Sequence, residues 1–149
     1  MSKFFMFTHF FNAAVLVRFA ISKLFAWPIS VAAFIEMAKP LGIDPTFFRI
    51  FTGITLTVVI IGYSISLYLI AKKGFPKKKE SAYWVGAANV LGGSVMVGAL
   101  FSEFLLRVSP KWPLVYIATA VVVFSALNLN RLRSIWPLRA DPQQASVCL

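Results

Sequence analysis

Three charged residues inside apolar segments are the residues of this sequence that could do chemistry. Arg18 and Lys23 lie in one apolar segment, and Glu103 lies in another. A charge inside a membrane is costly unless it is paired, hydrated or reaches the interface by snorkelling. The residues can therefore form a structural ion pair, with snorkelling of the remaining charge. The alternatives are a polar pocket for a lipid headgroup, a quinone or a small anion, and a site of proton transfer.

Helical geometry limits how these charges can pair. Arg18 and Lys23 are five residues apart, which puts them on different faces of a helix, so Glu103 can suit only one of them. Arg107 follows Glu103 by four residues, the spacing of an ion pair within one helix. The sequence leaves these alternatives open.

The remaining polar candidates predict no catalytic site. His9 is the only histidine and Cys148 the only cysteine, so the chain alone cannot hold a haem through two histidines or a His/Cys metal site. Asn89 and Asn128 are the other polar candidates, and we expect His9 to be hydrogen-bonded or solvated and not a ligand. The sequence contains no phosphate loop, catalytic triad or paired-carboxylate motif. We therefore predict no catalytic residue, no metal ligand, no cofactor bound by this chain alone and no activity of its own.

Composition predicts a single integral membrane domain over residues 1–149. Of these residues, 59% are hydrophobic and 13% are charged, about half the charged fraction of a soluble domain. The apolar stretches are long enough to cross about 30 Å of hydrocarbon, except for one short segment that contains Glu36 and Lys39. The prediction is an all-α, antiparallel bundle of four transmembrane helices with one interfacial helix and a flexible tail. The expected ranges are about 5–26, 46–71, 82–107 and 114–130 for the spans, 29–39 for the interfacial helix and 140–149 for the tail.

Local signals mark helix ends and a packing face. Asp44 is suited to the N-cap of the second span and Pro45 to its first position. The helix over 82–107 is rich in small residues, which let helix backbones approach closely in lipid. We predict that this helix is the central packing helix. Its packing residues occur in pairs four positions apart, Ala88 with Gly92 and Ser94 with Gly98.

The net charge of +10 is explained by membrane topology, which we favour over nucleic-acid binding. If both termini face one side, that side holds nine cations and the opposite side four. The prediction therefore puts both termini in the cytoplasm of a bacterium or the matrix of a mitochondrion, with the chain in the inner membrane. The Lys72–Lys79 loop also offers a surface for anionic lipids, at about 1 kcal/mol per cation. The nine are Lys3, Lys72, Lys73, Lys77, Lys78, Lys79, Arg131, Arg133 and Arg139; the four are Lys39, Arg49, Arg107 and Lys111.

The first half of the chain resembles the DoxX-like family of small four-helix membrane proteins. The segments that carry the resemblance are Ser22-Lys23-Leu24, Trp27-Pro28, the short segment that contains Phe34, Leu41-Gly42-Ile43-Asp44-Pro45, Gly53-Ile54 and Ile60-Ile61-Gly62. The chain lacks the acidic residue that the family commonly has in its second helix, because residues 52–57 contain none. The resemblance implies a four-helix bundle. It also implies kinship with subunits of thiosulfate:quinone oxidoreductases that associate with terminal oxidases.

These observations lead to one expected function and one alternative. The chain is expected to be a small non-catalytic subunit of a larger membrane complex, such as a respiratory or other energy-transducing redox assembly, with other membrane subunits as its partners. The alternative is a stand-alone DoxX-like redox partner that binds quinone or phospholipid near Arg18, Lys23 and Glu103. A minimal transporter is disfavoured because no inverted repeat is found and no helix breaks in mid-membrane.

Overall fold

The structure, a computed structural model, describes residues 2–73, 79–107 and 110–135, which fold into α-helices and one short 3-10 helix. Four of the helices, α1, α3, α4 and α5, are long and apolar enough to cross a membrane. The prediction of an all-α bundle with four spans and a short helix between the first two is confirmed. The tail at 140–149 lies outside the described residues. The elements are α1 (Ser2–Leu24), α2 (Pro28–Ala38), η1 (Lys39–Leu41), α3 (Pro45–Lys73), α4 (Lys79–Leu105) and α5 (Trp112–Ile135).

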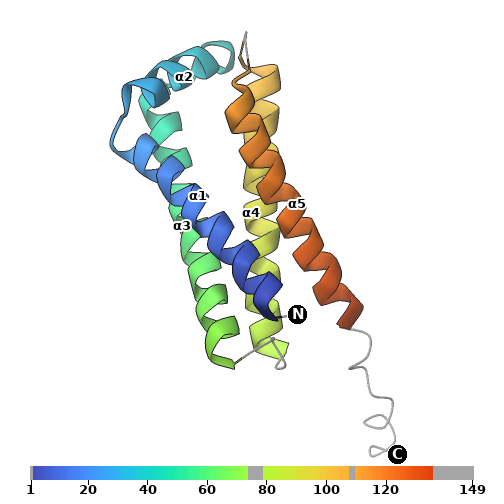
Figure 1. The fold of residues 1–149 in the computed structure, drawn as a ribbon. Coiled ribbons are helices and arrows are strands. Elements are labelled where there is room, and N and C mark those ends of the chain that lie inside the picture. Colours follow the sequence, from blue (N-terminus) through green and yellow to red (C-terminus); the bar gives the residue numbers. More distant parts are fainter. Residues whose placement is uncertain (1, 74–78, 108–109, 136–149) are drawn as a thin grey trace, which may run out of the picture.

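The four spans form two pairs, and α2 lies across one end of the bundle (Figure 1). α1 packs along α3, α4 packs along α5, and α3 joins the pairs by packing against α4. The start of α1 and the end of α5 lie at the end where α3 passes into α4, so the described chain begins and finishes on the same side of the bundle (Figure 1). α3 also contacts α2, and it is the most extensively packed of the four spans. The prediction that the helix over 82–107 is the central packing helix is wrong, because α3 makes more extensive contacts than α4.

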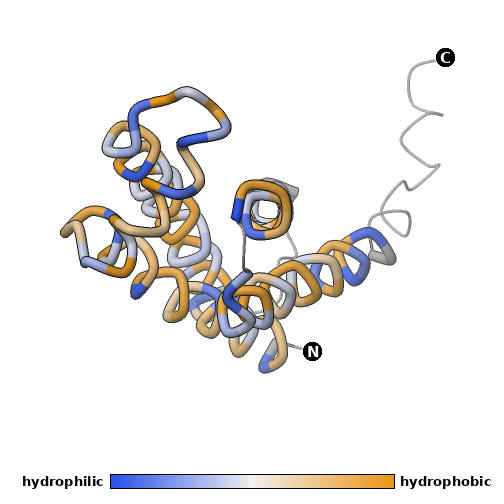
Figure 2. The backbone as a smooth tube through the Cα atoms, turned by 90° about the horizontal axis from the view of Figure 1, so that it is seen from above, coloured by the Kyte–Doolittle hydropathy of each residue, from blue (hydrophilic) through white to orange (hydrophobic). Residues whose placement is uncertain are grey.

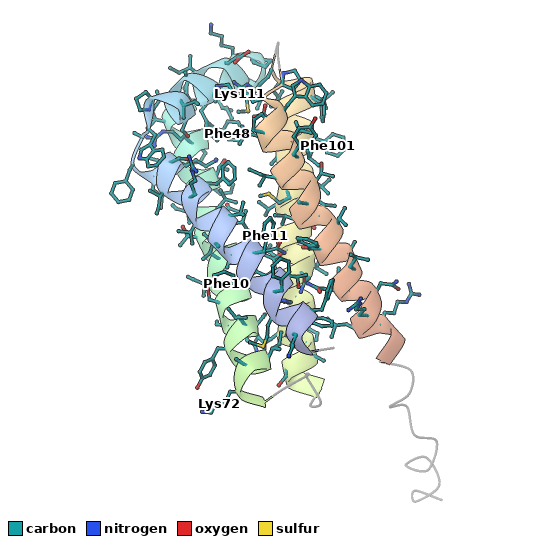
Figure 3. All side chains as sticks on the ribbon, viewed as in Figure 1. Phe10, Phe11, Phe48, Lys72, Phe101 and Lys111 are labelled. Carbon is teal, nitrogen blue, oxygen red and sulfur yellow. The ribbon has the colours of Figure 1, made fainter. Side chains whose placement is uncertain are left out.

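The outer surfaces of the spans are apolar, as a bilayer requires. Figure 2 shows hydrophobic residues over most of the four long helices. Phe10 and Phe101 are 62% and 60% exposed and point away from the bundle (Figure 3). Soluble monomers rarely expose such a large apolar surface. Exposed aromatic residues near the helix ends, including Trp27, Trp84 and Trp112, match the aromatic belts of membrane interfaces. The fold is that of an integral membrane protein.

The sequence signals at the start of α3 are confirmed in detail. The Asp44 carboxylate accepts a hydrogen bond from the backbone N–H of Phe47 at 2.7 Å, and Pro45 is the first residue of the helix. Such an N-cap satisfies one of the free N–H groups at the helix start. Just before it, Gly42 ends η1 with φ of 63°, a conformation that glycine adopts without steric cost.

The turn between α1 and α2 places an alanine in the left-handed region. Ala26 has φ of 50°. The N–H of Trp27 donates to the carbonyl of Ser22 at 3.0 Å, and the N–H of Ala26 donates to that of Lys23 at 3.5 Å. These are the two hydrogen bonds of a Schellman helix end, in which glycine is the usual left-handed residue.

Ala26→Gly is therefore expected to stabilise the protein by about 1 kcal/mol, because the left-handed conformation costs an L-residue about that much. The midpoint of reversible unfolding in mixed detergent micelles measures this effect. Ala14→Gly, at an exposed position inside α1, is the matched control. It should destabilise the protein instead, by up to about 1 kcal/mol. A loss of stability in Ala26→Gly would contradict the assigned turn.

Candidate functional site

Arg107 is the centre of an ion cluster beneath α2, at the end of the bundle where Lys111 lies (Figure 3). Its side chain is only 5% exposed and follows the end of α4. Nη1 of Arg107 lies 3.0 and 3.1 Å from the two carboxylate oxygens of Glu103. Nε of Arg107 lies 3.4 Å from Oε2 of Glu36 in α2. Arg107 thus connects α2 to the end of α4 through ion pairs. We call Glu36, Glu103 and Arg107 the outer ion cluster.

The outer ion cluster resolves the choice of partner for Glu103. Its carboxylate pairs with Arg107 and also accepts the backbone N–H of Lys111 at 3.3 Å. Lys23 makes no ion pair with Glu103 within 4 Å in the described part of the chain, although it lies close enough to be attracted by that carboxylate. The pair within one helix is the one that forms.

Lys23 is held at the same end by aromatic rings. Its ammonium lies 5.3 Å from the centre of the Phe19 ring in α1 and 5.7 Å from that of Phe34 in α2. Cations are attracted to aromatic faces at such distances. The residue as a whole is half-buried.

Arg49 has a structural role that its sequence position did not suggest. From the sequence we counted it only among the four cations on the side opposite the termini. In the structure it is 8% exposed in the first turns of α3, and its guanidinium donates a hydrogen bond to the backbone carbonyl of Lys23. The last carbonyls of a helix lack partners within the helix and carry partial negative charge. Arg49 therefore caps the end of α1.

Arg18 does not join this group. Its side chain is exposed on α1, and it has no hydrogen bond or ion pair with any other residue in the described ranges. Of the three predicted ligand candidates, the structure brings Lys23 and Glu103 to one end of the bundle and directs Arg18 outward.

Glu103→Gln should lower the free energy of unfolding by about 1–2 kcal/mol, because Arg107 would exchange an ionic hydrogen bond for a neutral one. Glu36→Gln is the matched control. Glu36 touches the same arginine, but its side chain is 35% exposed, so we expect a loss below about 1 kcal/mol. Unfolding in mixed micelles measures both. Equal losses would show that Glu103 is not the principal partner.

A second cluster of polar side chains lies inside the bundle, in the half near the start of α1. We call it the inner polar network. It contains residues from all four spans, each at most 1% exposed. The sequence pointed to three of its members as polar candidates, but gave no reason to group them with residues of α3 or with the neighbouring hydroxyls. The network consists of Thr8, His9, Asn12, Tyr63, Asn89, Ser125 and Asn128.

Hydrogen bonds connect three spans within the inner polar network. Nδ2 of Asn128 in α5 lies 3.0 Å from Oγ1 of Thr8 in α1 and 3.0 Å from Oδ1 of Asn89 in α4. Nδ2 of Asn89 lies 3.0 Å from Nε2 of His9. Because Nδ1 of His9 lies 2.8 Å from the backbone carbonyl of Phe5, the donor at this ring is Nδ1–H and Nε2 is the acceptor. The bonds join α1 to α4 and α5, which belong to the other pair of helices.

Tyr63 brings α3 into the inner polar network. Its hydroxyl lies 2.8 Å from Oγ of Ser125 in α5, and its ring centre lies 5.6 Å from that of His9. Asn12 lies close enough to Tyr63 to interact with its hydroxyl. However, neither amide atom of Asn12 has a hydrogen bond of ordinary geometry within the described ranges.

The small residues predicted for helix packing divide into two faces of α4. Ala88 and Gly92 are buried against α3. A Cβ placed on Gly62 would lie 3.4 Å from that of Ala88, and one placed on Gly92 would lie 2.2 Å from the Tyr63 hydroxyl oxygen. Ser94 and Gly98 are exposed instead. Ser94 lines an open, mainly apolar groove between α4 and α5, together with Gly86, Val90, Leu129 and Leu132.

The two clusters are chemically alike, because in each of them the donors and acceptors bond mainly to groups of this chain. The described residues contain no group of three or more His, Cys, Asp or Glu side chains placed to hold a metal ion. No family model, curated protein or solved structure matches the chain.

Proposed function

We propose that this protein is a small, non-catalytic integral membrane subunit of a larger membrane complex. The proposal rests on the observation that the buried ionisable groups in the described ranges bond to groups on neighbouring helices. Glu103 and Arg107 connect α4 to α2, and His9 connects α1 to α4. Intramembrane ionisable residues usually mark functional sites. Here they connect the helices of the bundle to each other, which favours a structural role over a catalytic one.

The groove between α4 and α5 supports the proposal because it is suited to a neighbouring helix. Gly86 and Ser94 line it, and a Cβ added at Gly86 would meet nothing within 4 Å. Apolar burial drives no association within lipid, so helices associate where small residues permit close backbone contact. The proposed occupant is a transmembrane helix of another subunit. The resemblance to DoxX-like proteins favours a respiratory or other energy-transducing redox assembly.

Filling this groove tests the proposal. Ser94→Leu should release the chain from its complex, because the larger side chain occupies the space that the partner helix needs. Ser64→Leu is the matched control, since Ser64 is also an exposed serine inside a span, on α3. Native electrophoresis of membranes dissolved in mild detergent measures the size of the assembly. A wild-type chain that migrates alone would contradict the proposal, and a complex indifferent to Ser94→Leu would exclude this groove as the interface.

The proposal includes an orientation. Lys72 lies at the end of the bundle that holds the start of α1 and the end of α5, opposite Lys111 (Figure 3). With most cations at that end, the positive-inside rule favours both termini in the cytoplasm or the mitochondrial matrix. The same cations favour anionic lipids as neighbours of the Lys72–Lys79 loop, of which residues 74–78 lie outside the described ranges.

A second candidate function rests on Lys23. Its ammonium lies beside two aromatic rings and is not neutralised by an ion pair within 4 Å in the described part of the chain. It could donate to a quinone carbonyl or a phospholipid phosphate. Extraction of the purified protein should then yield quinone or phospholipid in wild type and in Lys39→Leu but not in Lys23→Leu. Equal recovery from the two variants would exclude Lys23 as the binding group.

A further inference from the structure

Arg18 is a charged residue well inside a span, and its surroundings in the described part of the structure do not account for its charge. It lies within the first span, six residues before the end of α1 at Leu24. At 1.5 Å per residue this is about 9 Å below the helix end. The side chain is exposed and forms no hydrogen bond or ion pair with the rest of the described chain. A guanidinium in contact with lipid at that depth is costly unless it is paired, hydrated or reaches the interface, and an anionic partner meets this cost directly.

The partner must come from another polypeptide. Glu103 is the only acidic residue in the four spans, and its carboxylate is bound by Arg107 and the backbone of Lys111. A second copy of this chain offers no further acid at membrane depth, and a symmetric contact through this face would bring two Arg18 side chains together.

The face of α1 around Arg18 is shaped for a helix. Ala14 and Ser22 lie one turn before and after Arg18 on the same face, at i−4 and i+4. Ser22 donates its hydroxyl to the carbonyl of Phe19 at 2.8 Å, so its hydrogen-bonding need is met within α1. Small residues on both sides of a charge let a neighbouring backbone approach closely enough for its side chain to reach the guanidinium.

Side-chain direction favours a helix over a lipid phosphate. In an α-helix the Cα–Cβ bonds tilt toward the N-terminus, so Arg18 starts toward the membrane centre and away from the phosphates beyond Leu24. The planar guanidinium also matches a carboxylate through two parallel hydrogen bonds.

We propose that the Ala14–Arg18–Ser22 face of α1 docks a transmembrane helix of another subunit that carries an aspartate or glutamate at the depth of Arg18. This inference rests on the proposed function as a subunit and names the chemistry of one of its partners. The contact is separate from the groove between α4 and α5, which Ser94 lines.

A synthetic helix tests the proposal without knowledge of the natural partner. The full chain, labelled at its single cysteine Cys148, is placed in phosphatidylcholine vesicles with a leucine-rich transmembrane peptide that carries one glutamate at the matching depth. Energy transfer reports association. Wild type should bind this peptide about three- to thirtyfold more tightly than the peptide with leucine at that position. Arg18→Leu should abolish the preference and Arg18→Lys should retain part of it. Lys39→Leu, which removes an exposed cation outside the spans, should keep the preference.

Three results would overturn the proposal. One is equal binding of the two peptides by wild type. Another is a preference for glutamate that survives in Arg18→Leu. The third is loss of the preference when phosphatidylglycerol is added, which would identify a lipid phosphate as the anion that Arg18 binds. The natural complex separates this inference from the proposed function: if Ser94→Leu dissociates the complex while Arg18→Leu does not, the subunit role stands and the Arg18 contact fails.

Discussion

Gly92→Ala is expected to lower the free energy of unfolding by about 3 kcal/mol, the upper part of the range for overpacked cores. The added Cβ would lie 2.2 Å from the hydroxyl oxygen of Tyr63 and 2.7 Å from Cζ of its ring. Tyr63 cannot move aside freely, because it is fully buried and its hydroxyl is hydrogen-bonded to Ser125 at 2.8 Å. Either α3 and α4 separate or the Tyr63–Ser125 bond breaks.

Two comparisons make this prediction specific to the contact. Gly86→Ala and Gly98→Ala are the same change in the same helix, at positions where an added Cβ meets nothing within 4 Å. Both should be neutral or slightly stabilising, because alanine favours helix over glycine. Tyr63→Leu combined with Gly92→Ala should destabilise by less than the sum of the two changes, since leucine lacks the clashing atoms. Additive losses in this double-mutant cycle would rule out the Tyr63–Gly92 contact as the cause.

Asn89→Leu is the second large expected effect, with a loss of about 2–3 kcal/mol. The change removes the donor to Nε2 of His9 and one of the two acceptors of Nδ2 of Asn128, which keeps its bond to Oγ1 of Thr8. Interhelical hydrogen bonds in membranes contribute only about 0.6 kcal/mol on average. Most of the loss therefore comes from leaving Nε2 of His9 and one N–H of Asn128 buried without hydrogen bonds, because an unsatisfied buried polar group costs about 1–3 kcal/mol.

Asn12→Leu is a control of the same chemistry at the same burial. Asn12 and Asn89 are both 0% exposed, but neither amide atom of Asn12 has a hydrogen bond of ordinary geometry in the described ranges. Replacing it strands no partner, so we expect a change within about 1 kcal/mol of wild type, and in the stabilising direction if Asn12 is desolvated without compensation. Unfolding in mixed micelles compares the two variants. A larger loss in Asn12→Leu than in Asn89→Leu would contradict the hydrogen bonds assigned to the inner polar network.

The helices and their caps could be predicted because their causes are local. The length of each apolar stretch defines a span, and Asp44 with Pro45 defines a helix start whatever the neighbours do. The interfacial helix follows equally directly, because residues 29–39 are too few to cross the hydrocarbon.

The clusters could be predicted only in part, because they depend on how helices rotate against each other. His9, Asn89 and Asn128 were recognisable as polar residues in apolar segments. Their shared hydrogen bonds, however, depend on α1 facing both α4 and α5. The sequence did not indicate that Tyr63 is buried in the bundle, since tyrosine is also common in the aromatic belts at membrane interfaces. Only the structure shows it lying on Gly92.

The charged residues show the same limit. Sequence spacing allowed Glu103 to pair with Arg107 along its own helix, and this pair forms. Spacing could not show that Glu36 of α2 reaches the same arginine or that Arg49 caps α1. It placed Arg18 and Lys23 on different faces of α1 but did not say which face meets the bundle. That rotation leaves Arg18 exposed.

The native mass of the chain, extracted from its own membrane in mild detergent, tests the subunit role most directly. We expect the 16.6 kDa chain to be recovered in fixed stoichiometry with other integral membrane proteins. Ser94→Leu should shift the chain out of this species, and Ser64→Leu should not. Recovery of wild type solely as a monomer or a homodimer would contradict the subunit role.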